Sequence, residues 1–126
     1  MPTTETLERF IARVEENVHD VAIEEFYTLG ASMQENQSVP RVGLESLVAH
    51  ERRVLARAKS VVSKCIRPVC VNGDHVVIRW TFEFIWLDGS RTFMEEVTCQ
   101  RWDGERIAEE TFFYDPAQRI PVNAGA

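Results

Sequence analysis

The segment HVVIRWTFEFIWLDG, residues 75–89, alternates apolar and polar side chains and then ends in the turn pair Asp88-Gly89. Strict alternation of this kind predicts a β-strand with one buried face. The predicted buried face carries Val76, Ile78, Trp80, Phe82, Phe84 and Trp86. The other face carries His75, Arg79, Thr81 and Glu83. A strand this rich in aromatic residues needs a second layer packed against it.

Three more strands are predicted around this one, near residues 61–71, 91–102 and 106–115. They are separated by Asn72-Gly73, Asp88-Gly89 and Asp103-Gly104, and such pairs favour tight hairpin turns because glycine tolerates positive φ. Pro68 lies inside the first strand, which places it at a sheet edge or a bulge. The second half of the chain therefore predicts a four-stranded antiparallel meander.

The first half predicts helices. Apolar residues at helical spacing indicate a helix near residues 4–17. Asp20 is a candidate cap for a shorter helix that carries Ile23, Phe26 and Tyr27 and ends at Gly30. Residues 31–37 read as a short strand or extended segment, and a third helix follows with the stripe Leu44, Leu47, Val48, Leu55 and Ala58. The prediction is one α+β domain over residues 1–126, with helices packed against a curled sheet.

Composition limits the possible partners. The net charge of −6 argues against binding to nucleic acid or to anionic membranes, and no apolar run is long enough for a membrane span. The three cysteines lack metal-type spacing and are expected to be reduced. The three histidines also lack ligand spacing, so we expect no metal site. The first residues, MPTTETLERFIARVEE, carry acids where a secretory signal would need a basic end and an apolar run, and together with the reduced cysteines they predict a cytoplasmic protein.

The pairing of the second and third strands decides which acid faces the aromatic side chains. A two-residue turn at Asp88-Gly89 sets Phe84 opposite Phe93 and Phe82 opposite Glu95. Glu95 is then the one carboxylate on the apolar face. It lies at the rim of the pocket, or a bulge turns it outward, or it is a pocket acid that exchanges protons near neutral pH.

The stretches FYTLGASMQEN (26–36) and WDGERIAEETFFYDP (102–116), with a third helix that follows Gly43, resemble the SnoaL-like branch of the nuclear transport factor 2-like (NTF2-like) superfamily. The resemblance covers about residues 5–116. It implies a cone-shaped, cystatin-like fold in which a curled sheet wraps the helices and leaves a deep pocket. Members include ketosteroid isomerases, polyketide cyclases, epoxide hydrolases and dehydratases, and also non-catalytic binding or dimerisation modules.

The resemblance also implies two catalytic candidates. Glu35 matches the general base of isomerase-like relatives, and Asp115 matches an acid of the cyclase-like ones. The alternatives are a solvated strand end for Glu35 and a cap before Pro116 for Asp115. Ile11 stands where isomerase relatives have a tyrosine that stabilises the oxyanion, which disfavours steroid isomerisation. Arg79 and Arg91 lack an evident aspartate partner on the apolar face, which disfavours epoxide hydrolysis.

The orientation of the last strand remains open between two alternatives. Glu109 and Glu110 alternate, so only one faces the pocket. A two-residue loop formed by Asp103-Gly104 turns Glu110 inward, and an odd loop turns Glu109, Phe113 and Asp115 inward instead. The resemblance implies a buried Ile107 and so favours the odd loop.

The predicted pocket has an apolar wall and a few polar groups that converge on it. Its wall consists of Trp80, Phe82, Phe84 and Phe93, and its polar residues are Tyr27, Glu35, Glu95 and Asp115. His50, on the flank of the third helix, is either a titratable neighbour of the pocket or merely a partly buried residue.

Two functions are compatible with this pocket. One is cofactor-independent acid–base catalysis, of cyclase, isomerase or dehydratase type, on an apolar carbonyl or polyketide-like compound. The other is non-catalytic binding of a small ligand, or dimerisation alone. We expect a homodimer through the outer face of the sheet, at Arg79, Thr81, Glu83, Met94, Glu96 and Thr98.

Overall fold

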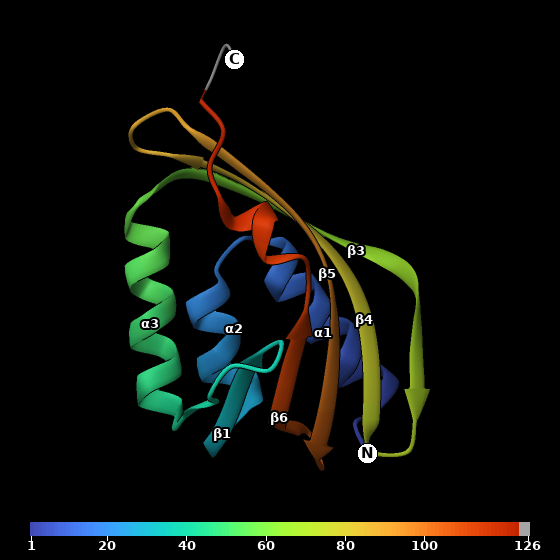
Figure 1. Cartoon of the computed structure of the whole chain (residues 1–126). Coiled ribbons are helices and arrows are strands. Elements are labelled where there is room, and N and C mark those ends of the chain that lie inside the picture. Colours follow the sequence, from blue (N-terminus) through green and yellow to red (C-terminus); the bar gives the residue numbers. More distant parts are fainter. Residues whose placement is uncertain (124–126) are drawn as a thin grey trace.

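The computed structural model describes residues 1–123, in which a curled six-stranded sheet wraps around three helices (Figure 1). The helices are α1 (Thr4–Glu15), α2 (His19–Phe26) and α3 (Leu44–Ala56). The strands are β1 (Tyr27–Glu35), β2 (Arg41–Val42), β3 (Ala58–Asn72), β4 (His75–Trp86), β5 (Arg91–Asp103) and β6 (Arg106–Phe113). A short 3-10 helix, η1 (Pro116–Arg119), follows.

The sheet has the strand order β2-β1-β6-β5-β4-β3. The predicted meander of four antiparallel strands is confirmed, and β1 adds to it in parallel with β6. Pro68 lies on the edge strand β3, where the pairing with β4 is irregular between Ile66 and Cys70, as its missing N–H requires. In Figure 1 the long strands arch over the helices.

Several predicted boundaries in the first half need correction. The second helix begins at His19 and ends at Phe26, so Tyr27 belongs to β1 and Gly30 does not end a helix. Ala58 lies in β3 and not in the third helix. Residues 41–42, which the sequence left unassigned, form the short strand β2. The apolar spacing identified these elements, but it did not determine where a helix gives way to a strand.

The β4–β5 hairpin has a longer turn than predicted. Ile85 pairs with Arg91, and Leu87, Asp88 and Gly89 form a three-residue loop whose Gly89 has φ of 87°. Three-residue hairpin loops commonly end on such a left-handed glycine. The extra residue shifts the register by one, so Phe84 lies opposite Thr92 and Phe82 opposite Met94.

This shift reverses the two faces of β5. Thr92, Met94 and Glu96 face the helices, whereas Phe93 is 51% exposed and Glu95 is exposed. The predicted inward positions of Phe93 and Glu95 are therefore wrong. The predicted outward positions of Met94, Glu96 and Thr98 are wrong for the same reason.

The β5–β6 pairing contains a bulge that the sequence did not reveal. Trp102 pairs with Ile107 and Arg101 with Glu109, which leaves Ala108 as an additional residue. Because of it, Ile107 and Glu110 both point inward although they are three positions apart. Glu109 is exposed and pairs with Arg101, so the expectation that Glu109 faces the pocket is wrong.

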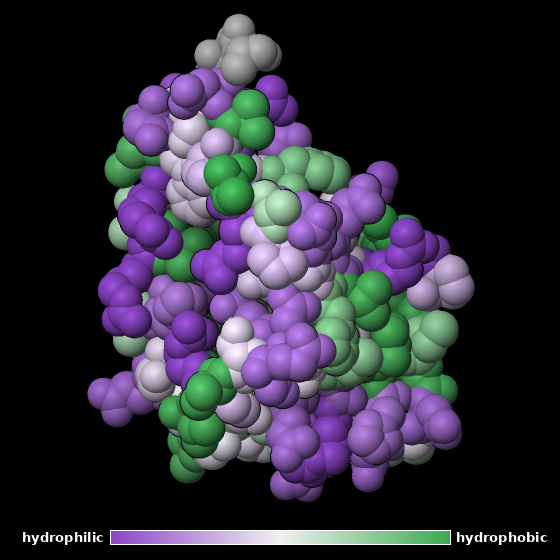
Figure 2. Space-filling model, in the orientation of Figure 1, coloured by the Kyte–Doolittle hydropathy of each residue, from purple (hydrophilic) through white to green (hydrophobic). Residues whose placement is uncertain are grey.

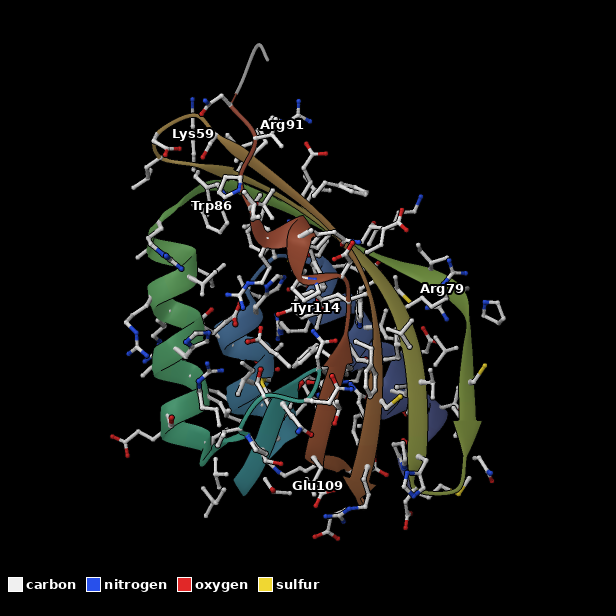
Figure 3. The ribbon with its side chains drawn as sticks, in the orientation of Figure 1. Lys59, Arg79, Trp86, Arg91, Glu109 and Tyr114 are labelled. Carbon is white, nitrogen blue, oxygen red and sulfur yellow. The ribbon has the colours of Figure 1, made fainter. Side chains whose placement is uncertain are left out.

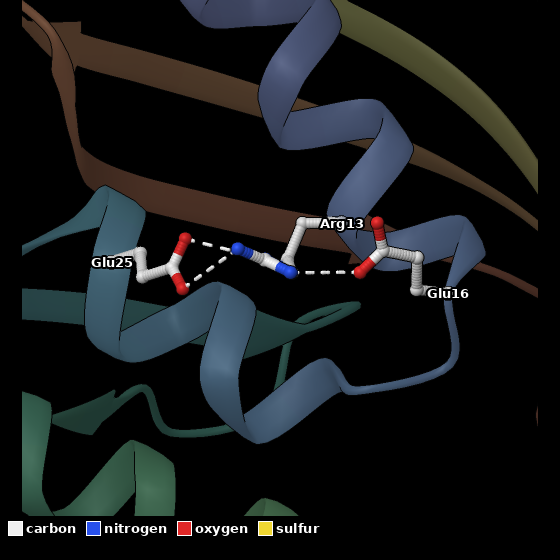
Figure 4. Close-up of polar contacts among 3 residues, drawn as sticks. All are labelled: Arg13, Glu16 and Glu25. Carbon is white, nitrogen blue, oxygen red and sulfur yellow. Dashed lines mark hydrogen bonds and ion pairs between the residues drawn. The ribbon is translucent and has the colours of Figure 1, made fainter.

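The core lies between the inner face of the sheet and the helices. It includes Phe10, Ile11, Leu47, Ile78, Trp102 and Ile107, all at most 2% exposed. At the surface, Arg13 of α1 bonds Glu16 and Glu25, and the second of these contacts joins α1 to α2 (Figure 4). Within residues 1–123, none of the helices has both the length and the apolar character that a membrane crossing requires.

Candidate active site

A cavity of about 650 Å³ opens between the helices and the concave face of the sheet. Its apolar lining comes from Phe10, Val14, Ala22, Ile23, Met33, Val54, Trp80, Phe82, Phe84, Trp86, Leu87, Met94, Phe112 and Pro121. Its polar lining comes from His19, Tyr27, Glu35, Arg41, His50, Glu51, Arg57, Asp88, Ser90, Thr92, Glu96, Glu110 and Arg119. A volume of this size accommodates a small organic molecule.

Alternate side chains of β4 form an aromatic row along the cavity. The ring centroids of Trp80 and Phe82 are 5.6 Å apart, and those of Phe84 and Trp86 are 4.9 Å apart with parallel planes. The Trp86 indole N–H donates to Thr92 Oγ1 at 2.8 Å, which fixes the ring. Figure 3 shows Trp86 beneath the arch of the strands, whereas Arg79 of the same strand projects from the outer side. The row provides an apolar wall with one fixed end.

Glu110 is the deepest acid of the cavity, at 3% exposure. The Tyr27 hydroxyl donates to its Oε1, and Gln100 Nε2 donates to its Oε2 at 2.7 Å. Gln100 in turn accepts the Trp102 indole N–H at 2.9 Å. Burial raises the pKa of Glu110 to about 7, although both hydrogen bonds favour its ionised form. The phenol pKa of Tyr27 is raised well above its ordinary value, by burial first and then by the charge of Glu110.

Glu96 lies on β5 opposite Trp80, and it lines the same cavity. Burial raises its pKa to about 8, and the charges of Glu110, Glu35 and Glu51 act in the same direction. No side chain of residues 1–123 hydrogen-bonds or ion-pairs with its carboxyl group, which distinguishes it from Glu110. Near neutral pH, Glu96 is therefore a protonated carboxyl group available to a ligand.

The C-terminal segment contributes to the other end of the cavity. Arg119 of η1 contacts Glu35 Oε2 at 3.3 Å and the Tyr114 hydroxyl at 3.2 Å. The Arg57 guanidinium lies 5.7 Å from the centroid of the Trp86 ring. The cavity thus combines an apolar wall with a polar, partly ion-paired rim.

The structure brings together six of the residues predicted for the pocket: Tyr27, Glu35, His50, Trp80, Phe82 and Phe84 all line the cavity. The pKa of His50 is lowered, by burial first and by the charge of Arg41 second, which favours the neutral form of its ring. The other three predicted residues are elsewhere. Phe93 and Glu95 lie on the outer face, and Asp115 is exposed and accepts the Ala117 N–H at 3.0 Å as the cap of η1. The cap before Pro116, the alternative interpretation of Asp115, is thus the observed one.

Sequence reasoning missed Glu51, Glu96, His19 and Arg119, which all line the cavity, and it left the inward-facing Glu110 as the less favoured of two alternatives. The pairs Glu95-Glu96 and Glu109-Glu110 each guaranteed one inward acid, but the loop length and the bulge decided which one. Among residues 1–123, no group of three or more His, Cys, Asp or Glu side chains is arranged to hold a metal ion.

Comparison with solved structures identifies the fold. A ketosteroid isomerase-like protein from Catenulispora acidiphila, in complex with trimethylamine, superposes with a TM-score of 0.75 at 18% identity over 92% of this chain and 89% of its own. A protein assigned to the SnoaL-like polyketide cyclases, from Jannaschia sp. CCS1, gives 0.72 at 17% identity over 88% and 83%. An LEH-like epoxide hydrolase from M. tuberculosis gives 0.74 at 16% identity over 90% and 83%.

The chain therefore has the NTF2-like fold, in the form shared by SnoaL-like and ketosteroid isomerase-like proteins, as the sequence resemblance implied. No protein-family model matches the sequence, and a search of curated proteins found no match. Identities of this size establish the fold, so the chemistry has to be argued from the cavity itself.

Proposed function

We propose that this protein binds a small, largely apolar carbonyl compound in its cavity and catalyses proton transfer on it. The observation that carries the proposal is the pair of carboxyl groups, Glu96 and Glu110, set in a cavity with an aromatic wall. A protonated carboxyl group in apolar surroundings can donate to a carbonyl oxygen as negative charge develops there. Isomerisation, dehydration and aldol-type ring closure all need this step.

The two carboxyl groups have different roles in this proposal. Glu96 is the proton donor, and Glu110 is the neighbouring acid whose charge acts on Glu96. Glu110 is held by Tyr27 and Gln100, so its orientation is fixed by the protein. Glu96 has no such partner, so its proton is available to the ligand. With pKa values of about 7 and about 8, the pair retains a proton at neutral pH. All the groups required are side chains, and the proposal therefore needs no cofactor.

The named relatives support small-molecule chemistry in this fold. They include two proteins assigned to the SnoaL-like polyketide cyclases, an LEH-like epoxide hydrolase and TerC, which was co-crystallised with polyporic acid. The aromatic row of the present cavity fits the flat, apolar body of such compounds.

The test is hydrogen exchange on simple ketones in deuterium oxide, followed by proton NMR, with β-tetralone and phenylacetone as probes. The wild type should accelerate exchange at the carbon beside the carbonyl. Glu96→Gln should lower that rate by roughly two to four orders of magnitude, the usual contribution of a positioned acid. Glu95→Gln, one residue away on the outer face, is the matched control and should keep the wild-type rate.

Non-catalytic binding is the competing outcome of the same experiment. Trp80 and Trp86 line the cavity, so their fluorescence reports a bound ketone independently of turnover. Quenching by the ketones with no exchange above background would assign the protein to ligand binding and remove the catalytic proposal.

We also propose that two copies pair through the outer face of the sheet. Val62 of β3, Phe93 of β5 and Phe113 of β6 expose 62%, 51% and 42% of their surface. Figure 2 shows hydrophobic side chains gathered over the lower parts of β3 and β4. Light scattering should give twice the 14.5 kDa of one chain, and the double substitution Phe93→Lys, Phe113→Lys should return the single mass.

Cys65, Cys70 and Cys99 are all free, which supports a reducing compartment such as the cytoplasm.

A further inference from the structure

Three polar side chains form a chain of hydrogen bonds on the helical side of the cavity. The Oγ atom of Ser63, on β3, lies 2.7 Å from His19 Nε2. His19 is the first residue of α2, and its Nδ1 atom lies 3.3 Å from Oε1 of Glu51, on α3. Three separate elements supply these residues, so only the tertiary fold brings them together.

The partners determine where the hydrogens lie. An ionised Glu51 can only accept, so the hydrogen on that side belongs to His19 Nδ1. A neutral His19 then has Nε2 as an acceptor, which takes the Ser63 hydroxyl hydrogen. A protonated His19 donates from Nε2 instead, and the hydroxyl oxygen accepts. The chain therefore stays complete in either charge state of the imidazole.

Burial orders the three residues from the core to the cavity. Ser63 is 7% exposed and does not line the cavity, whereas the side chains of His19 and Glu51 are 12% and 20% exposed and both line it. The Phe82 ring packs against the imidazole at 5.3 Å, so the ring is held on a third side. Both ring nitrogens are occupied. Among residues 1–123, the second Glu51 oxygen, Oε2, has no hydrogen-bond partner, and it is the free end of the chain.

Two neighbouring explanations fit less well. Ser63 as a nucleophile requires a hydroxyl that a cavity ligand can reach, and its position behind His19 prevents this. His19 as a direct proton acceptor requires a free nitrogen, and both are engaged. Glu51 remains as the member that meets a ligand.

We propose that Glu51 is the proton acceptor of the site, on the wall opposite Glu96, and that His19 and Ser63 are its positioning residues. The inference rests on the proposed function and names the base which that reaction requires. Sheet-borne Glu96 and helix-borne Glu51 share one cavity, so a ligand between them meets a donor on one side and an acceptor on the other.

The step is balanced in protons and electrons. Glu51 takes a proton from the carbon beside the carbonyl group, and the electrons of that C–H bond form a carbon–carbon double bond. The carbonyl π electrons move to the oxygen, which takes the proton of Glu96. The product is the enol, with Glu51 protonated and Glu96 ionised, and the reverse step restores both groups. The preferred substrate is a ketone with an acidic C–H bond and an apolar body.

The ketone exchange assay tests the acceptor. Glu51→Gln should lower exchange by roughly two to four orders of magnitude. Glu45→Gln, on an exposed position of the same helix, is the matched control and should leave the rate unchanged. Ser63→Ala should lower the rate by roughly ten-fold, and Ser63→Thr, which keeps the hydroxyl, should restore most of it.

Nitrogen NMR of the imidazoles tests the positioning pair without any substrate. Neutral His19 should carry its hydrogen on Nδ1, and Glu51→Gln or Ser63→Ala should reduce that preference, while the exposed His75 should show no such change.

Three results would overturn the inference. They are a neutral His19 protonated on Nε2, a Glu51→Gln variant with wild-type exchange while Glu96→Gln is inactive, and covalent labelling of Ser63 by a fluorophosphonate. Failure of the proposed function itself would give a different pattern, in which the wild type exchanges neither ketone. That result would remove the catalytic roles of both Glu96 and Glu51. The NMR experiment would then test only whether Ser63, His19 and Glu51 form the hydrogen-bond chain.

Discussion

The adjacent acids Glu95 and Glu96, and likewise Glu109 and Glu110, have the same side chain and opposite environments. Glu95 and Glu109 lie in solvent on the outer face, and the pKa of Glu109 is lowered by the hydrogen bond from Arg101. Glu96 and Glu110 lie in the cavity, where burial raises both pKa values. One step along a strand thus separates a solvated surface charge from a protonated group. The chemistry belongs to the position in the sheet and not to the residue type.

The largest expected difference between the two faces concerns stability. Glu110→Ala leaves the Tyr27 hydroxyl and the Gln100 amide without their partner in a buried site, and should cost about 2–4 kcal/mol. Glu109→Ala removes only an exposed ion pair and should cost less than about 1 kcal/mol. Urea unfolding measures both. Equal losses would mean that the buried hydrogen-bond network does not distinguish the two faces.

The pH dependence of stability gives a second, smaller difference. The raised pKa of Glu96 means that the folded state binds its proton more tightly than the unfolded state, where the value is near 4.5. Its contribution is complete below that value and is lost as the pH rises through about 8. Glu96→Gln stays neutral, so it should equal the wild type near pH 4 and exceed it by about 1–3 kcal/mol near pH 9.

Thermal unfolding across this pH range measures the effect, and Glu95→Gln is the control that should follow the wild type at every pH. A Glu96→Gln variant whose stability falls with pH as steeply as the wild type would show that Glu96 is not protonated in the folded protein.

The smallest expected effect lies in the turn that sets the β4–β5 register. Gly89 has φ of 87°, where a Cβ is strained although no neighbour lies within 4 Å, so Gly89→Ala should cost about 1 kcal/mol. Gly30→Ala adds a methyl group in equally open space without a positive φ, and should be nearly neutral. Chemical denaturation compares the two. If Gly89→Ala proved neutral, the three-residue turn would not require its left-handed residue.

Much of the architecture was predictable from local chemistry. The alternation along β4, the three glycine turns and the helical spacing around Phe10 and Leu47 identified the helices, the meander and the aromatic wall, because these patterns depend on near neighbours in the chain. Tyr27, Glu35 and His50 were also assigned to the cavity. The residues missed or misplaced lie mostly on β5 and β6, where the prediction depended on register.

The sequence by itself determined that each of two adjacent pairs of glutamates would supply one acid to the apolar side of the sheet, since successive side chains of a strand point to opposite faces. Only the tertiary structure decided that these acids are Glu96 and Glu110. One additional residue in the Leu87–Gly89 loop and one at Ala108 reverse the faces, and both depend on how the strands pair. The contact of Ser63, His19 and Glu51 is also beyond sequence patterns, because three elements distant in the chain must pack together before those hydrogen bonds exist.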